Sequence, residues 1–333
     1  MAVIRDMMPA FELYQPATVD EAVSLAVRHG RDGWVLAGGM DSFDWLKDRI
    51  KRPRAVIDLG AIASLREIRH FEGGLEIGAM ATLTDVARHP DVQNRFALLA
   101  DAIRHVATPQ IRNQGTLGGN LCQDTRCWYY RGGWPCYRAG GNVCYASAPL
   151  AMNREHAITG MKRCVAVNPS DTAAALIALD AQMVIRQRRG ERTVDAEDFF
   201  IGPAIDITRM TVLRPGDLLT AVRLPDAWAG ARVYFEKVRD RNAWDFPLVT
   251  VASAMVLRNG TIERVRIAVN GVAPYPMRLH DVERAVTGRT TNEETAAMAG
   301  ELAVRRVTPL RHNDYKLPLL RNLVRRSLRG TET

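Results

Sequence analysis

The chain has 333 residues, of which 47% are hydrophobic and 25% are charged, and its formal net charge is +8. This length is too great for one small core and predicts two or three domains of ordinary size. The composition is that of a globular protein, which excludes disordered and fibrous classes, and no apolar run is long enough to cross a bilayer. We therefore expect no membrane insertion.

The termini and the charge distribution narrow the expected setting. The N-terminal residues lack the charged and apolar regions of a signal peptide, which predicts a cytoplasmic protein. The basic residues are spread along the chain, and their densest group, RNLVRRSLRG near the C-terminus, is predicted to form one solvated helix. Because no aromatic residues alternate with these charges, we expect no nucleic-acid partner, and the basic surface suits anionic ligands or a partner subunit.

The first sixty residues alternate between helix and strand. Thr18 is a helix N-cap, Glu21 completes a capping box, and Gly30 ends the helix. A buried strand over 34–39 then runs into a pair of glycines, before a short helix and a second strand over 54–60. Glycines between a strand and a helix let the backbone approach a phosphate, although such pairs are more often simple turns.

A second pattern covers the chain up to residue 225. It predicts a strand, a helix entered at Thr84, an amphipathic helix over 94–107 and a glycine-rich turn at 115–120. Two glycine turns in one domain indicate a diphosphate held between two loops. The segment SDTAAALIALDAQMVIRQ then predicts a helix followed by a strand.

The remaining residues form a strand-rich unit. Asn259-Gly260 is a strong signal for a two-residue hairpin turn. Helices are predicted over 278–287 and 293–306, and a domain boundary near 226. The fold class is therefore α+β with mixed sheets.

The cysteines are concentrated in one segment with little periodicity. Five occur in the chain, with separations of 5, 9, 8 and 20 residues and no CxxC pair: Cys122, Cys127, Cys136, Cys144 and Cys164. Disulfides need an oxidising compartment and usually an even count, and zinc usually takes close CxxC pairs. An iron–sulfur cluster accepts wider spacings. The residues rank a cluster first, zinc second and unligated thiols third, and His156 is a less favoured alternative ligand.

Five motifs, in order along nearly the whole chain, carry a family resemblance. They are WVLAGGMDSFDWLKDR with RAVIDLG, IGAMATLTDVA, PQIRNQGTLGGNL, NPSDTAAALIALDA and YFEKVRDRNAWDFPLVTVA. Together they resemble the FAD-binding medium subunits of the molybdenum hydroxylases, the xanthine dehydrogenase family. The resemblance implies a two-lobed FAD-binding domain of the vanillyl-alcohol-oxidase type. Its first lobe would cover 1–60, its second 61–225 with a cysteine-rich insertion at 121–168, and an α+β C-terminal domain would cover 226–333.

The resemblance also implies the residues that contact FAD. The backbone of Leu36, Ala37, Gly38, Gly39, Met40, Asp41 and Ser42 would wrap the pyrophosphate, and Thr116, Gly119, Asn120 and Thr125 would hold its other side. Asp171 would bind the ribose or phosphate region, Leu219 would pack near a ring, and Lys237 would lie near the flavin. Many relatives have threonine where this chain has Met40, so a side-chain hydrogen bond is lost there while backbone contacts remain.

Two branches of the family carry a [4Fe-4S] cluster at the position of the insertion. They are the β subunit of 4-hydroxybenzoyl-CoA reductase and the FAD subunit of bacterial aldehyde oxidoreductases of the periplasmic type. The implied ligands are Cys127, Cys136, Cys144 and Cys164, with Cys122 as a spare. The motifs around these cysteines match the two branches in different places, which leaves the substrate open.

The implied function is electron transfer, with no catalytic residue for the substrate in this chain. Substrate chemistry would occur at the molybdenum cofactor of a large subunit, and a small subunit would carry two [2Fe-2S] clusters. Electrons would pass between those clusters, FAD and an external acceptor or donor. Alternatives from another class are a standalone flavoprotein and a non-redox subunit with a structural zinc loop. Export with a partner subunit would carry the complex to the periplasm.

Overall fold

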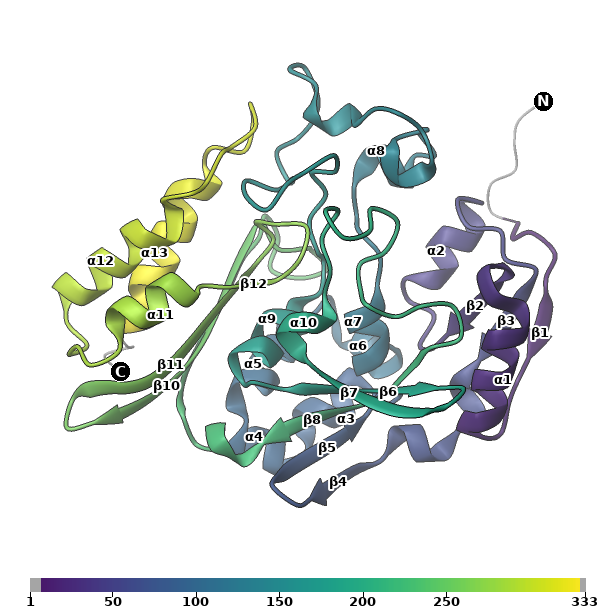
Figure 1. Cartoon of the computed structure of the whole chain (residues 1–333), viewed down its shortest axis with the longest axis horizontal. Coiled ribbons are helices and arrows are strands. Elements are labelled where there is room, and N and C mark those ends of the chain that lie inside the picture. Colours follow the sequence, from purple (N-terminus) through teal and green to yellow (C-terminus); the bar gives the residue numbers. More distant parts are fainter. Residues whose placement is uncertain (1–6, 330–333) are drawn as a thin grey trace.

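The computed structural model describes residues 7–329, which form three β-sheets with helices packed against them (Figure 1). An N-terminal lobe, a central lobe and a C-terminal domain each contain one sheet. The predicted α+β class is confirmed. The expectation of mixed sheets was wrong, because one sheet is wholly parallel and the other two are wholly antiparallel.

The N-terminal lobe is a small parallel sheet with strand order β1-β3-β2. Its elements are β1 (Glu12–Tyr14), α1 (Val19–His29), β2 (Gly33–Leu36), α2 (Ser42–Lys47) and β3 (Ala55–Asp58). The predicted cap of α1 is confirmed, since the Thr18 hydroxyl accepts a hydrogen bond from the Glu21 backbone N–H. The Glu21 carboxylate reaches back to the N–H of Ala17, so the turn before the helix is fixed from both sides.

The central lobe contains a five-stranded antiparallel sheet, order β4-β5-β8-β6-β7, covered by short helices. The strands are β4 (Ile68–Phe71), β5 (Gly74–Gly78), β6 (Gln182–Gln187), β7 (Gly190–Asp195) and β8 (Leu218–Pro225). The helices are α3 (Leu83–Arg88), α4 (Pro90–Arg95), α5 (Ala97–Arg104), α6 (Pro109–Gln114), α7 (Leu117–Cys122), α9 (Asp171–Ala178) and α10 (Ala196–Phe199).

Three local predictions in this lobe were wrong. The helix expected to begin at Thr84 begins at Leu83, and Thr82 caps it. The helix expected over 94–107 is two helices, because the backbone of Phe96 leaves helical geometry between α4 and α5. The segment expected to be a glycine-rich turn at 115–120 enters helix α7, because the Thr116 hydroxyl caps it.

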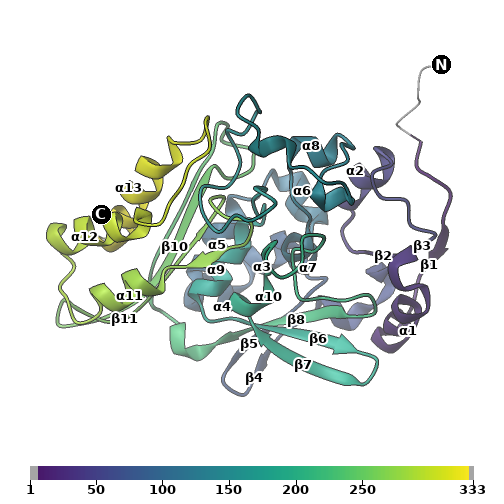
Figure 2. The same ribbon diagram turned by 45° about the horizontal axis from the view of Figure 1, so that its top comes forward.

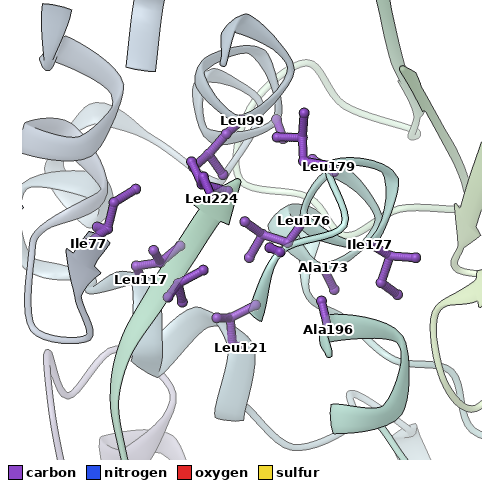
Figure 3. Close-up of a cluster of buried hydrophobic side chains, with 14 of the residues drawn as sticks. Ile77, Leu99, Leu117, Leu121, Ala173, Leu176, Ile177, Leu179, Ala196 and Leu224 are labelled. Atoms are coloured by element: carbon purple, nitrogen blue, oxygen red, sulfur yellow. The ribbon is translucent and has the colours of Figure 1, made fainter. Parts of the chain in front are cut away.

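The core of the central lobe lies between its sheet and helices α5, α7 and α9. Figure 3 shows Leu99 of α5, Leu117 and Leu121 of α7, Leu176 of α9 and Leu224 of β8 close together. Helix α9 is buried on every side, which explains its almost continuous apolar sequence. This packing holds Asp171, the first residue of α9, in a fixed and buried position.

The C-terminal domain is an antiparallel sheet of order β12-β11-β10-β9 with helices on its outer side (Figure 1). Its elements are β9 (Arg232–Val238), β10 (Val249–Arg258), β11 (Thr261–Asn270), β12 (Met277–Arg278), α11 (His280–Val286), α12 (Glu293–Val304) and α13 (Lys316–Arg329). The predicted hairpin at Asn259-Gly260 is confirmed, with both residues at positive φ. Helix α13 was expected to be solvated, but it buries an apolar face against β10.

The cysteine-rich segment is an irregular excursion between α7 and α9. It contains one short helix, α8 (Trp128–Arg131), and 3-10 turns at Tyr137–Ala139 and Tyr145–Ser147. In both views it lies between α2 of the N-terminal lobe and the C-terminal sheet (Figure 2). Each of the three parts of the chain forms hydrogen bonds with it.

Candidate functional site

A cavity of about 550 Å³ lies where the N-terminal lobe, the central lobe and a loop of the C-terminal domain meet. The residues after β2, the start of α7, the start of α9 and the loop 244–246 form its walls. Eleven of the fourteen residues expected to contact a cofactor line it: Ala37, Gly38, Gly39, Met40, Asp41, Ser42, Thr116, Gly119, Asn120, Asp171 and Leu219. Leu36, Thr125 and Lys237 lie behind this wall.

The first glycine loop packs directly against the second. A Cβ atom at Gly38 would lie 2.2 Å from the carbonyl oxygen of Gln114, so no side chain fits there. Gly39 has a φ of +80°, and its carbonyl accepts a hydrogen bond from the N–H of Phe43 as α2 begins. The two glycine segments thus form one continuous wall of backbone.

The second glycine segment is held by side-chain hydrogen bonds. The Thr116 hydroxyl accepts from the N–H of Gly119 at 3.0 Å. The Asn120 amide oxygen accepts from the hydroxyls of Ser170 and Thr172, both at 2.7 Å. The bonds of Asn120 join α7 to the start of α9, and both of these helix starts line the cavity.

A buried ion pair lies at the start of α9. The Lys237 ammonium donates to Asp171 Oδ2 at 2.6 Å and to the carbonyls of His105 and Asp245. Burial raises the pKa of Asp171, and the charge of Lys237 opposes that rise. The second carboxylate oxygen, Oδ1, is buried without a hydrogen-bond partner on the cavity wall. It is an available acceptor for a hydroxyl of a bound molecule.

Asp41 joins the first glycine loop to the cysteine-rich segment. Its carboxylate accepts from Arg126 Nη1 at 2.8 Å and from Arg131 Nη2 at 2.5 Å. It also accepts from the Trp45 indole and from the N–H of Asp124. These four bonds occupy the carboxylate, which therefore anchors the loop. Sequence reasoning missed both arginines, because nothing in their spacing points to Asp41.

The cysteine cavity is a small second cavity, lined by Cys127, Cys136, Cys144 and Cys164. All five cysteines are free thiols, and Cys122 lines the larger cavity instead. Burial raises the pKa of Cys127 to about 12, so without a metal its thiol stays protonated and unreactive. The free volume between the side chains is about 10 Å³, so a four-iron cluster would require the thiols to move apart.

The geometry of the cysteine cavity bears on the kind of metal site. Within the described part of the chain, no three His, Cys, Asp or Glu side chains converge as they would around a single ion. Four cysteine thiols around one cavity are a donor set that a four-iron cluster uses and that a structural zinc ion also uses. His156, weighed from the sequence as an alternative ligand, is buried with Nε2 at 3.3 Å from Cys127 Sγ.

The C-terminal domain holds the cysteine-rich segment through its backbone. The fully buried Lys316 ammonium donates to the carbonyls of Glu155, His156 and Gly271 at 2.7–3.0 Å. The Asn313 amide also donates to the carbonyl of His156. Sequence reasoning missed this clamp, since a lysine at a helix start normally indicates a surface position.

The comparisons with known proteins agree with this arrangement. Residues 9–227 match the model for the FAD binding domain in molybdopterin dehydrogenase, and residues 233–331 match the CO dehydrogenase flavoprotein C-terminal domain. The FAD-binding subunit PaoB of the Escherichia coli aldehyde oxidoreductase is 36% identical over 82% of this chain and 84% of its own length. The carbon monoxide dehydrogenase medium chain of Hydrogenophaga pseudoflava is 31% identical over 96% of both chains.

Solved structures give the same result. The carbon monoxide dehydrogenase of Hydrogenophaga pseudoflava superposes with a TM-score of 0.78 at 30% identity, covering 97% of this chain and 98% of that one. Quinoline 2-oxidoreductase of Pseudomonas putida superposes with a TM-score of 0.75 at 26% identity, covering 97% and 96%. The fold and the matched domain models define an FAD-binding oxidoreductase subunit. The chain belongs to the FAD-binding medium subunits of the molybdenum hydroxylase family.

The comparisons do not extend to the cluster. They support FAD binding and the aldehyde oxidoreductase branch, and they carry no information on iron. Among residues 7–329, no helix is both long enough and apolar enough to cross a bilayer.

Proposed function

We propose that this chain is the FAD and [4Fe-4S] electron-transfer subunit of a heteromeric molybdenum-dependent oxidoreductase that acts on aldehydes or similar aromatic substrates. Its partners would be a large molybdopterin-binding subunit, a small subunit with [2Fe-2S] clusters, and an external electron acceptor or donor. The observation that carries the proposal is the meeting of four cysteines in one cavity beside the larger one. Arg126 lines the larger cavity and the next residue, Cys127, lines the cysteine cavity.

The residues of the larger cavity fit FAD. The glycine walls at 37–42 and 116–120 would offer backbone N–H groups to a pyrophosphate, and the absence of a side chain at Gly38 lets the first segment pack on Gln114 and keep that wall closed. The free Oδ1 of Asp171 would accept a ribose hydroxyl, and Leu219 would pack against a ring. The bound flavin supplies the exchange of one or two electrons. Lys237 would hold Asp171 in place.

Residues behind the wall would act as supports. Leu36 ends β2 and pairs with Asp58 of β3, which sets the exit of the first glycine loop. The Thr125 hydroxyl donates to the carbonyl of Val167 and so joins the two ends of the cysteine-rich segment. We keep the division into lobes 1–60 and 61–225 and a domain 226–333, which the separation of the three sheets supports.

The test of this proposal is chemical analysis of the purified full chain under anaerobic conditions. We expect about one FAD and four irons with four sulfides per chain, and the EPR signal of a reduced cubane, which has four thiolate ligands. Cys144→Ser should lose most of the iron, whereas the matched control Cys122→Ser should keep it, because Cys122 lies outside the cysteine cavity. One zinc, or no metal, would overturn the cluster and leave an FAD subunit with a structural loop.

Two other functions are separated by activity measurements. A standalone flavoprotein would oxidise its substrate without partners, whereas an electron-transfer subunit should be inactive until the large and small subunits are added. A 4-hydroxybenzoyl-CoA reductase-like β subunit would instead pass electrons inward to a thioester substrate. Insertion of flavin and cluster favours assembly in the cytoplasm, and export on a partner's signal would then lead to the periplasm.

A further inference from the structure

A buried arginine, Arg138, forms part of the wall of the cysteine cavity. Arg138 is only 7% exposed to solvent. One guanidinium nitrogen, Nη1, donates to the carbonyl of Ile207 at 2.7 Å, and the other, Nη2, donates to Asp124 Oδ1 at 2.5 Å. The Nε–H group is buried without any acceptor. The Nε atoms of Arg186, Arg192 and Arg239 are also buried without an acceptor, but among these four arginines only Arg138 lines the cysteine cavity, where a bound anionic group would face it.

The charges around Arg138 do not cancel. Asp124 is shared with Lys51, whose ammonium lies 3.7 Å from its other oxygen, so two cations face one carboxylate. The rest of the cavity wall is aromatic or apolar: Tyr129, Tyr130, Tyr145, Ala146, Val165 and Ala166. A net positive charge is therefore held beside the cysteines in a poorly screened environment.

We propose that Arg138 compensates the negative charge of the cluster that the four cysteines would bind, and so stabilises its reduced state. This inference rests on the cluster of the proposed function. Arg138 acts on a one-electron reduction in which no bond forms or breaks and no proton moves. The electron would be supplied by bound reduced flavin or, in a titration, by dithionite, and Arg138 would keep its charge throughout.

The chain offers a matched control at Arg163. This arginine precedes Cys164 directly, but it is exposed and its guanidinium lies over the ring of Tyr137. Water screens the charge of Arg163, so removing it should change the potential in the cysteine cavity little, whereas the buried charge of Arg138 is poorly screened. Arg138→Lys retains the charge without the Nε–H, and so separates an electrostatic role from one of packing.

The experiment is an EPR-monitored redox titration of the anaerobically purified full chain, with iron, sulfide and FAD measured first. Arg138→Gln should lower the equilibrium constant for cluster reduction at least tenfold, a shift of about 59 mV to more negative potential. Arg138→Lys and Arg163→Gln should both stay within threefold of the wild type. If Arg138→Gln fails to retain iron, a cluster of near wild-type potential in Arg138→Lys still supports the role.

Three results would overturn the inference. They are an unchanged potential in Arg138→Gln, an equal shift in Arg138→Gln and Arg138→Lys, and loss of iron from both variants with FAD retained. A wild-type chain that holds FAD without iron or sulfide would overturn the cluster and, with it, the role of Arg138. An iron-replete wild type with an insensitive potential would overturn the role of Arg138 alone.

Discussion

Replacing Lys237 with methionine tests the buried ion pair at the start of α9. The Lys237 side chain is 0% exposed and that of Asp171 is 5% exposed. Removing the ammonium leaves a carboxylate buried without its cation and two carbonyls without their donor. Breaking such a pair on one side typically costs about 3–5 kcal/mol. We expect Lys237→Met to lower the free energy of unfolding by about this amount at pH 8.

The double variant Asp171→Asn/Lys237→Met removes both charges and should recover part of that loss. The pH dependence gives a second check. Burial raises the pKa of folded Asp171, so the contribution of this group is complete below its unfolded pKa and is lost as the pH rises through the folded value. Without Lys237 this rise is unopposed, and the loss of stability should be smaller at pH 5 than at pH 8.

The assay is urea unfolding followed by tryptophan fluorescence at both pH values, with the exposed Lys162→Met as the control expected to stay within about 0.5 kcal/mol. A loss below about 1 kcal/mol for Lys237→Met at pH 8, with the same loss at pH 5, would refute the reasoning. In that case water or local rearrangement screens Asp171, and the pair does not hold the cavity wall.

Three further predictions address the clamp and the glycine walls. Burial lowers the pKa of Lys316 from 10.5 to about 7. Between pH 7 and 10 the unfolded chain therefore binds more protons than the folded chain, and the stability of the fold should rise with pH. Lys316→Met should reduce this dependence of the thermal unfolding midpoint on pH. Gly38→Ala should push the first glycine segment away from Gln114 and reduce the FAD content at least tenfold by absorbance. Near-stoichiometric FAD would show that the packing of the two glycine segments does not shape the FAD site. Thr116→Ala should cost about 1 kcal/mol through its lost cap and weaken FAD binding in calorimetry. The matched Thr82→Ala, which removes the cap of α3, should lose similar stability and keep FAD affinity.

Local chemistry made much of the fold predictable from the sequence. Thr18 and Glu21 fix the start of α1 through their own neighbours, and Asn259-Gly260 fixes a hairpin through its own backbone preference. The glycine-rich segment before the cysteines was misjudged because glycine lowers helix propensity, while the Thr116 cap and packing against Ala79 outweigh that effect.

The site was predictable where residues act through their backbone and unpredictable where partners come from distant segments. The glycines at 38 and 39 indicate close packing of the chain, because they lack side chains. Three of the four partners of Asp41 lie more than eighty residues away, and the carbonyls bound by Lys316 come from three residues of two other segments. No spacing in the sequence encodes such contacts, because only the folded chain brings them together.

The clamp on the cysteine-rich segment also sets an order of events during synthesis. The carbonyl of Glu155 leaves the ribosome 161 residues before Lys316, which at ordinary rates of translation is roughly 8–32 s. During that interval the four thiols belong to a loop whose C-terminal support does not yet exist. Under the proposed function, this is the interval in which a cluster would be inserted, and docking of α13 would then fix the carbonyls of Glu155 and His156.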